Sequence, residues 1–360
     1  MLKKNNFTLE NIRRLKTKTG LDPSLLERAV YAFGLLEALS LVGLDFVFKG
    51  GTSLMLLLDE PKRLSTDIDI IIRPGTDIDR FIEKASEIFP FVRCEEQVRR
   101  KAQNIEKRHF KFLYKSPVRD EDLHIILDVV FEENNYSSIL KKEIVNSLLD
   151  TEPPATYITV PTVNCVLGDK LTAFAPHTIG IPFGIGKEME IIKQLYDIAT
   201  LVDKVDNFSD VKDTYRRFAE VEIEYRGLKN VSFRETLIDS FNAAVTMIGK
   251  GKLFPDDYMY LLDGVRRIKG HIFDGYSSVI AEKQSCRAAY LIANILADNR
   301  ELVQITNTDS YADKSITNSA YKKLNYVKKA DLTDFAFLYE AIRLFEAEVA
   351  NNTWDESGRS

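Results

Sequence analysis

The sequence predicts an α+β protein, in which a small mixed β-sheet with flanking helices is followed by an α-helical half. Strand-like segments alternate with short helical ones between residues 46 and 165, whereas apolar residues recur at helical spacing from Val166 onward. A stretch with three prolines, 153–161, separates the two regions. We therefore expect an N-terminal α/β domain over residues 1–165 and a C-terminal α-helical domain over residues 166–360.

The first expected helix starts at Asp22 and runs to about Leu44. Asp22 is suited to the N-cap and Pro23 to the first helical position, and the apolar residues follow helical spacing. The next segment, 46–51, has a strand pattern that enters a turn with two adjacent glycines. A second helix is expected directly after the turn, over residues 52–61, where a proline ends it.

The remaining strands are predicted from alternating polar and apolar residues or from short apolar runs. The segment 124–131 (HIILDVVF) is almost wholly apolar, so it is expected at the centre of the sheet. A further helix is expected from Asp77 to about Ile88. The other predicted strands cover residues 66–72, 108–116 and 156–160.

The C-terminal half is predicted to be helical, with one long loop near its start. This loop covers residues 176–190 and contains three glycines, and its length is typical of a functional or mobile segment. Helical patterns with apolar residues three or four positions apart follow it. These patterns cover residues 211–227, 232–251, 255–273, 284–299 and 330–350.

The charge of the chain limits the way in which it could bind nucleic acid. Across 360 residues, 49 Lys and Arg stand against 54 Asp and Glu, which gives a net charge of −5. This balance argues against a uniformly basic nucleic-acid binder. Basic residues do cluster from Arg99 to Lys115, a stretch that could guide an RNA backbone or form a solvated hairpin.

Cysteine content and hydropathy indicate the compartment. The three cysteines are far apart and show no CxxC spacing, which argues against a disulfide framework and a structural zinc site. The longest apolar run, Leu54 to Leu58, is far shorter than the roughly 20 residues that cross a bilayer. With no signal-peptide pattern at the start of the sequence, we expect a cytoplasmic protein without a membrane partner.

Two closely spaced carboxylates stand out in the segment 66–72. Asp67 and Asp69 are two positions apart on a predicted strand, so their side chains leave the same face with Cα atoms roughly 6 to 7 Å apart. Two like charges in one place are unfavourable unless a cation binds, and hard oxygen ligands suit Mg²⁺ or Mn²⁺ better than zinc. A strand edge that emerges into solvent can carry the same residues without binding a metal.

The glycine turn before this strand offers a site for phosphate. Gly50 and Gly51 are followed by Thr52 and Ser53 at the expected helix N-terminus. Backbone N–H groups, hydroxyls and the positive end of the helix dipole could there bind phosphate oxygens. Such a turn also occurs as an ordinary connection, and the sequence has no P-loop. Its combination with the carboxylate pair favours a metal-bound nucleoside triphosphate between the two elements.

Asp128 is the candidate for a third carboxylate. It is the only acidic or basic residue, histidine aside, in the segment 124–131, and a carboxylate in a central strand is unfavourable without a partner. It could act as a metal ligand or general base in a two-metal site. Alternatively, Asp128 could form an ion pair with a nearby arginine.

These segments resemble the AbiEii/AbiGii-type nucleotidyltransferase toxins of the DNA-polymerase-β-like nucleotidyltransferase superfamily. The resemblance covers roughly residues 45–205 and implies a nucleotidyltransferase domain followed by helices that complete the active site and bind the acceptor. It rests on five motifs in the family's order: KGGTSL (49–54), RLSTDIDI (63–70), ILDVVF (126–131), GDKLTAF (168–174) and KQLYDIATL (193–201).

The resemblance also implies roles for individual residues. Gly51 and Ser53 would hold the triphosphate, and the two carboxylates of segment 66–72 would ligate the metal. Lys170 would contact phosphate or base, and Asp197 would complete the site.

Lys193 occupies a position where the family often has arginine, and we place it among the nucleotide-binding residues. Each of these helical residues also has an ordinary interpretation. Lys170 could be a solvated residue of an amphipathic helix, and Lys193 and Asp197 could form a surface salt bridge.

The function that the resemblance implies is nucleotidyl transfer. Family members transfer nucleotides, in characterised cases to the 3′ end of tRNA, and act as toxins opposed by a cognate antitoxin. We therefore expect metal-dependent transfer of NMP from an NTP to an RNA 3′ hydroxyl by the toxin of a toxin–antitoxin or abortive-infection system. Alternatives are transfer to a protein or small-molecule hydroxyl, or a non-catalytic protein whose helical domain binds a partner.

Overall fold

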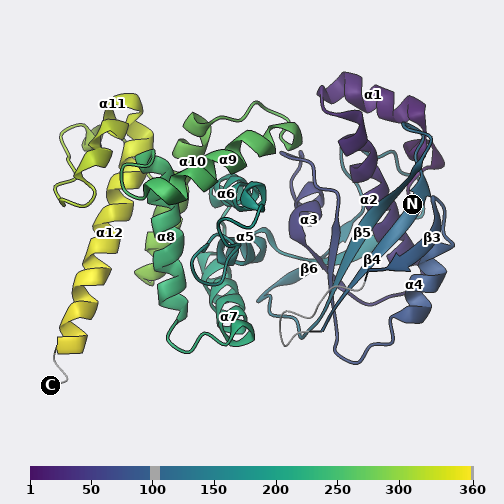
Figure 1. The fold of residues 1–360 in the computed structure, drawn as a ribbon, viewed down its shortest axis with the longest axis horizontal. Helices are drawn as coiled ribbons and strands as arrows, with labels where there is room; N and C mark the ends of the chain where they lie inside the picture. Colours follow the sequence, from purple (N-terminus) through teal and green to yellow (C-terminus); the bar gives the residue numbers. More distant parts are fainter. Residues whose placement is uncertain (98–105, 358–360) are drawn as a thin grey trace. The chain divides into compact units, whose positions relative to one another are not determined.

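The computed structural model describes residues 1–97 and 106–357. The chain forms two compact units, which Figure 1 shows as a sheet with helices and as a group of helices. Unit 1 comprises Met1–Val166 and the short segment Gly270–Gly275, and unit 2 comprises Leu167–Lys269 and Tyr276–Ser360. The predicted α+β fold is therefore confirmed.

Unit 1 is built on a seven-stranded mixed sheet with the order β3-β4-β5-β2-β1-β7-β6. β2 is parallel to β5 and β1 is parallel to β7, whereas the other neighbours are antiparallel. β3 and β6 were not expected from the sequence. The strands are β1 (Val47–Lys49), β2 (Ile68–Ile72), β3 (Phe91–Glu96), β4 (Lys107–Lys115), β5 (Asp122–Phe131), β6 (Ile139–Glu143) and β7 (Tyr157–Pro161).

The hydrophobic core of unit 1 lies on one face of this sheet. Ile70 of β2, Leu127 of β5 and Phe110 of β4 share it with residues of four helices, because alternate residues of a strand point to the same face. The residues between them therefore point to the opposite face. The helices of this core are α1 (Leu9–Thr19), α2 (Pro23–Leu41), α3 (Gly50–Leu57), which follows β1 directly, and α4 (Asp79–Ser86).

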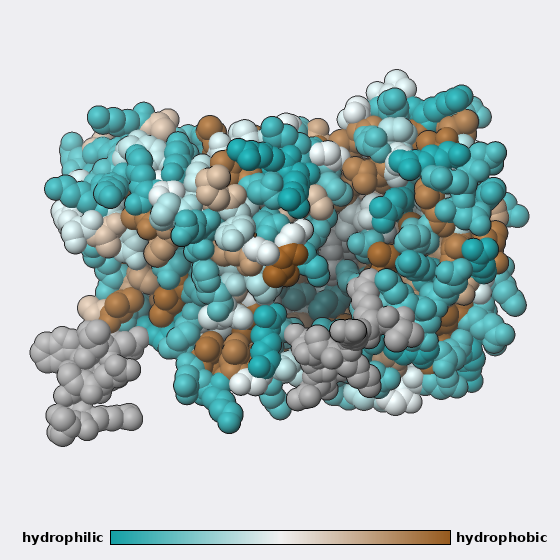
Figure 2. Space-filling model, in the orientation of Figure 1, coloured by the Kyte–Doolittle hydropathy of each residue, from teal (hydrophilic) through white to brown (hydrophobic). Residues whose placement is uncertain are grey.

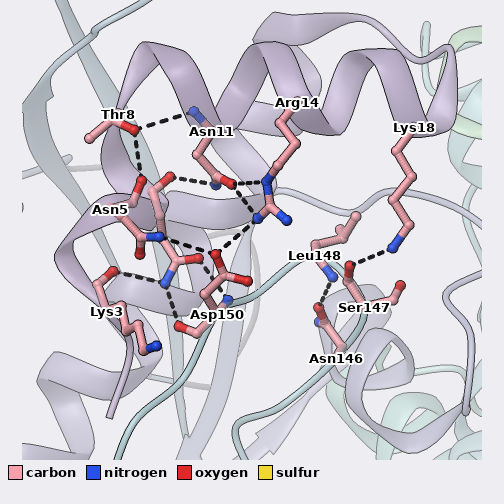
Figure 3. Close-up of polar contacts among 11 residues, drawn as sticks. Lys3, Asn5, Thr8, Asn11, Arg14, Lys18, Asn146, Ser147, Leu148 and Asp150 are labelled. Carbon is pink, nitrogen blue, oxygen red and sulfur yellow. Dashed lines mark hydrogen bonds and ion pairs between the residues drawn. The ribbon is translucent and has the colours of Figure 1, made fainter.

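Hydrogen bonds to the main chain attach two further segments to unit 1. Asn6 donates a hydrogen bond from Nδ2 to Asp150 O (2.7 Å) and accepts one from Asp150 N at Oδ1 (2.9 Å). Figure 3 shows Asn5 and Arg14 at the side chain of the same aspartate. Farther along the chain, Leu64 N donates to His271 O at 2.7 Å. The N-terminal turn and the segment Gly270–Gly275 are thus parts of the sheet-containing unit.

Unit 2 is helical, and α10 contacts α6, α8 and α12. The helical pattern over 255–273 is interrupted in the structure: α9 ends at Arg267, a 3₁₀ turn follows, and the chain then enters unit 1. The helices are α5 (Val163–Thr172), α6 (Glu188–Val202), α7 (Phe208–Arg226), α8 (Phe233–Gly249), α9 (Pro255–Arg267), α10 (Ser278–Leu296), α11 (Val327–Ala330) and α12 (Leu332–Ser357).

Among the described residues, no helix combines the length and apolar character that crossing a bilayer requires. On the face drawn in Figure 2, hydrophobic residues are scattered among hydrophilic ones.

Candidate active site

The turn between β1 and α3 requires glycine at two successive positions. Gly50 has φ +82°, a left-handed conformation that side chains rarely adopt, and a Cβ atom on it would collide with Asp69 Oδ2. A Cβ on Gly51 would lie 2.6 Å from Arg63 Nη2 and 2.7 Å from Ser65 Oγ. The missing side chains therefore allow a carboxylate and a guanidinium to approach the backbone at the start of α3.

The two hydroxyls that follow the glycines stabilise the turn itself. Thr52 and Ser53 are fully buried. Thr52 Oγ1 donates to Asp67 O at 2.6 Å, and Ser53 Oγ donates to Gly50 O at 2.8 Å. Since the first N–H groups of a helix have no intrahelical acceptor, the backbone of this turn is the part best suited to bind phosphate.

A row of polar residues crosses four neighbouring strands at one level of the sheet. Asp69 of β2 is paired with Asp128 of β5 and with Lys49 of β1, and Asp128 is paired with His109 of β4. At least one neighbour of each along its strand belongs to the core, so all four side chains point to the opposite face. β2 begins at Ile68, so Asp67 immediately precedes the strand instead of lying within it.

The carboxylates of this region have basic partners. His109 Nδ1 lies 2.5 Å from Asp128 Oδ1, with side chains that are 15% and 30% exposed. Arg28 Nη2 lies 3.8 Å from Asp67 Oδ1. Among the described residues, the basic partner of Asp128 is therefore His109 and not an arginine. Sequence reasoning missed His109, since only the register of β4 against β5 brings it to Asp128.

The donor chemistry of the row fits a divalent cation. Asp69 and Asp128 present hard oxygens side by side on parallel strands, the ligand type that Mg²⁺ and Mn²⁺ prefer. Within residues 1–97 and 106–357, however, no three His, Cys, Asp or Glu side chains are gathered as a metal site. The structure thus brings Asp69 and Asp128 together as a pair, while Asp67 contacts Arg28.

The site residues predicted in the helical half, Lys170, Lys193 and Asp197, all belong to unit 2. Lys170 Nζ of α5 lies 3.3 Å from Asp197 Oδ2 of α6, and the two side chains are only 9% and 3% exposed. Lys193 Nζ lies 2.9 Å from Glu190 Oε1. Two ordinary interpretations are therefore wrong: Lys170 is not a solvated residue, and Asp197 is not part of a surface bridge.

The long loop predicted at 176–190 is held by carboxylates of neighbouring helices. Glu188 Oε1 accepts hydrogen bonds from Gly184 N (3.1 Å) and Gly186 N (3.2 Å). Asp239 Oδ2 of α8 accepts hydrogen bonds from the backbone N–H of His177 and the hydroxyl of Thr178, each at 2.8 Å. Burial raises the pKa of Asp239, and these hydrogen bonds oppose that rise. The loop therefore has a defined path over unit 2.

The basic stretch offered as an RNA guide is partly engaged in ion pairs. Arg108 contacts Asp79 at 2.7 Å and Glu96 at 2.8 Å, and Lys115 contacts Asp122 at 3.4 Å. Three further members, Arg99, Arg100 and Lys101, lie outside the described residues.

A glycine turn next to carboxylates on adjacent strands is suited to nucleotidyl transfer, and sequence comparison agrees. Residues 34–253 match the model of a family described as nucleotidyl transferase AbiEii toxin, type IV toxin–antitoxin system. Because the match covers more than half of the chain, the protein belongs to this family of toxin nucleotidyltransferases and is an enzyme.

Comparison with solved structures finds similar chains at low identity. JHP933 from Helicobacter pylori is 13% identical with a TM-score of 0.41, over 76% of this chain and 93% of that chain. A second H. pylori protein, proposed to be a nucleotidyltransferase, is 12% identical with a TM-score of 0.43, over 78% of this chain and 99% of that chain. No curated protein sequence matches this chain.

Proposed function

We propose that this nucleotidyltransferase moves NMP from an NTP to the 3′ hydroxyl of an RNA, with tRNA as the expected acceptor. The observation that carries the proposal is the pairing of Asp69 with Asp128 beside the turn of Gly50 and Gly51. The proposal includes a cognate antitoxin as partner and action in the cytoplasm, where nucleotides and RNA are present.

The residues of unit 1 divide the reaction between them. Backbone N–H groups at the start of α3 bind phosphate oxygens. Asp69 and Asp128, with Asp67, would hold Mg²⁺ or Mn²⁺, and the bound ion would neutralise phosphate charge and polarise the α-phosphate. Asp128 accepts the proton of the attacking 3′ hydroxyl, and His109 fixes the orientation of its carboxylate. The new bond joins the 3′ oxygen to the α-phosphorus, the bond between the α-phosphorus and its bridging oxygen breaks, and pyrophosphate leaves.

The helical residues of unit 2 are proposed to act on the nucleotide. Lys170 contacts a phosphate or the base, and Asp197 positions it through their buried ion pair. Lys193 supplies a second cation to the nucleotide. Because the chemistry needs mainly charge stabilisation, loss of a metal-binding carboxylate lowers the rate by orders of magnitude while the fold persists.

A labelling assay tests this function. The purified protein is incubated with total tRNA, Mg²⁺ or Mn²⁺, and each radiolabelled NTP separately. The Asp69→Asn variant removes a ligand charge, and Asp77→Asn, an exposed residue of the loop before α4, is the matched control. We expect RNA labelling by the wild type and Asp77→Asn, no labelling by Asp69→Asn, and loss of labelling with EDTA.

Gel electrophoresis of the labelled products distinguishes an RNA acceptor from a protein or small-molecule acceptor. Label that migrates with protein or with small solutes would contradict an RNA acceptor. Equal labelling of RNA by the wild type and Asp69→Asn would contradict the role given to the carboxylate row.

A further inference from the structure

A cavity of about 330 Å³ lies in unit 1 where α2 and β5 begin. Its lining includes Arg28 of α2, Arg119 of the β4–β5 turn and His124 of β5, together with Ser24. The proposed reaction gives this cavity no role. Because Arg28 and Arg119 line it, the cavity is suited to bind an anion.

The guanidinium groups of Arg28 and Arg119 have N–H groups that can donate hydrogen bonds to a ligand. Arg28 is 34% exposed, and its 3.8 Å approach to Asp67 is too long for a hydrogen bond. Within the described part of the chain, no hydrogen bond is made by its guanidinium. Arg119 is 54% exposed, donates from Nε to Ser24 Oγ at 3.3 Å and approaches Glu121 Oε1 at 3.5 Å. Planar guanidinium groups are the side chains best matched to phosphate oxygens.

The acid of the cavity and its histidine are compatible with an anionic ligand. Asp22 also lines the cavity, but its Oδ1 accepts hydrogen bonds from Ser24 N and Leu25 N as the cap of α2. Burial lowers the pKa of His124, and the positive charges of Lys111 and Arg28 lower it further. His124 is therefore a neutral hydrogen-bonding group near neutral pH, in a positive field.

The cavity and the proposed site share strand β5, which carries both His124 and Asp128. His124 and Asp128 lie on the same face of this strand, four residues apart, which corresponds to roughly 13 Å. Lys111 of β4, paired with Ile126, lies between them. Arg28 also contacts Asp67, next to the carboxylate row. A short stretch of extended single strand ending at Asp128 could cover this distance.

We propose that the cavity binds a backbone phosphate of the acceptor RNA, upstream of its 3′ hydroxyl. The inference rests on the proposed function, because it takes the 3′ end to lie at the carboxylate row. The turn before α3 serves the triphosphate, so the cavity of Arg28 and Arg119 is available to the acceptor strand.

The test measures RNA binding separately from transfer. Full-length protein is titrated into a 12-nucleotide single-stranded RNA with 5′ fluorescein and a free 3′ hydroxyl, and anisotropy is followed at several salt concentrations. Arg119→Gln and Arg28→Gln are expected to weaken binding about tenfold each and to reduce the salt slope by about 1. Arg80→Gln, an exposed arginine of α4, is expected to bind like the wild type.

Calorimetric titration with each NTP and Mg²⁺ completes the test, and circular dichroism confirms that the variants fold. Unchanged RNA affinity in Arg119→Gln, which alters an exposed side chain, would overturn the proposal. A loss of NTP affinity with unchanged RNA affinity would overturn it in favour of a nucleotide subsite. If the wild type binds RNA through this cavity but labels no RNA, the cavity is supported and the proposed function fails.

Discussion

The contact between His109 and Asp128 shows how much the candidate site depends on strand register. The two residues are 19 positions apart, yet the pairing of β4 with β5 places Nδ1 2.5 Å from Oδ1. In the sequence His109 is one of four histidines without close spacing, and nothing local to it indicates a carboxylate partner. Asp69 and Asp128, in contrast, could be singled out as acids within apolar strand patterns.

Replacement of His109 tests whether it orients Asp128. We expect His109→Ala to lower kcat of labelling about 10- to 100-fold with little change in KM for NTP, the usual effect of losing a partner of a ligating group. His109→Asn retains a donor near the position of Nδ1 and should recover part of the rate. Equal activity of His109→Ala and the wild type, or no rescue by Asn, would contradict a positioning role.

Glu27 gives a prediction for stability as a function of pH. Neither of its carboxyl oxygens has a hydrogen-bond partner among the described residues, and the side chain is fully buried. Burial raises the pKa of Glu27 above its ordinary 4.5, and Ser116 and Arg119 oppose the rise. Below pH 4.5 both the folded and the unfolded chain hold the proton. Above it the unfolded chain releases the proton first, so stability falls as the pH rises through the folded pKa.

Glu27→Gln removes this ionisation. We expect the variant to be more stable than the wild type by about 1–3 kcal/mol at pH 7.5, with a smaller difference near pH 4.5. Thermal melting at both pH values measures it, and Glu83→Gln, an exposed residue of α4, is the control. A difference that is larger at pH 4.5 than at pH 7.5 would contradict the assignment.

Elements with strong local signals could be predicted, whereas elements that depend on pairing could not. Asp22 and Pro23 mark the start of α2, and the apolar run of β5 marks a central strand. β3 has a mostly exposed pattern and β6 is an edge strand with Lys141 and Lys142, so neither shows the usual alternation. α1 is rich in polar residues, and its position depends on contacts with the distant segment 146–150.

The buried ion pair of Lys170 and Asp197 joins α5 to α6, and we expect its disruption to lower the stability of the protein strongly. Lys170→Met would remove the cation that faces the buried carboxylate of Asp197, and we expect a loss of about 3–5 kcal/mol in the free energy of unfolding. Addition of Asp197→Leu should recover most of this loss. Lys193→Met, whose partner Glu190 is 40% exposed, should change stability by less than about 1 kcal/mol. Calorimetry of the variants gives these values, and equal effects of Lys170→Met and Lys193→Met would contradict the buried pair.

At the scale of the whole molecule, composition and periodicity predicted the α+β class. They did not predict that the chain returns from unit 2 to unit 1. The segment Gly270–Gly275 belongs to unit 1 although it is flanked by helices of unit 2. Its contacts include backbone hydrogen bonds such as Leu64 N to His271 O, which leave no pattern in side-chain hydropathy. The assignment of Lys170, Lys193 and Asp197 to the reaction stays a prediction, as does the choice of acceptor.

Sequencing of RNA 3′ ends tests most directly the claim that the row of Asp69 and Asp128 transfers nucleotides to RNA. Cellular RNA is sequenced after brief expression of the wild type and of Asp69→Asn at matched protein levels. The account predicts added nucleotides at tRNA 3′ ends with the wild type and unmodified ends with Asp69→Asn. Identical 3′ ends in both samples would contradict it.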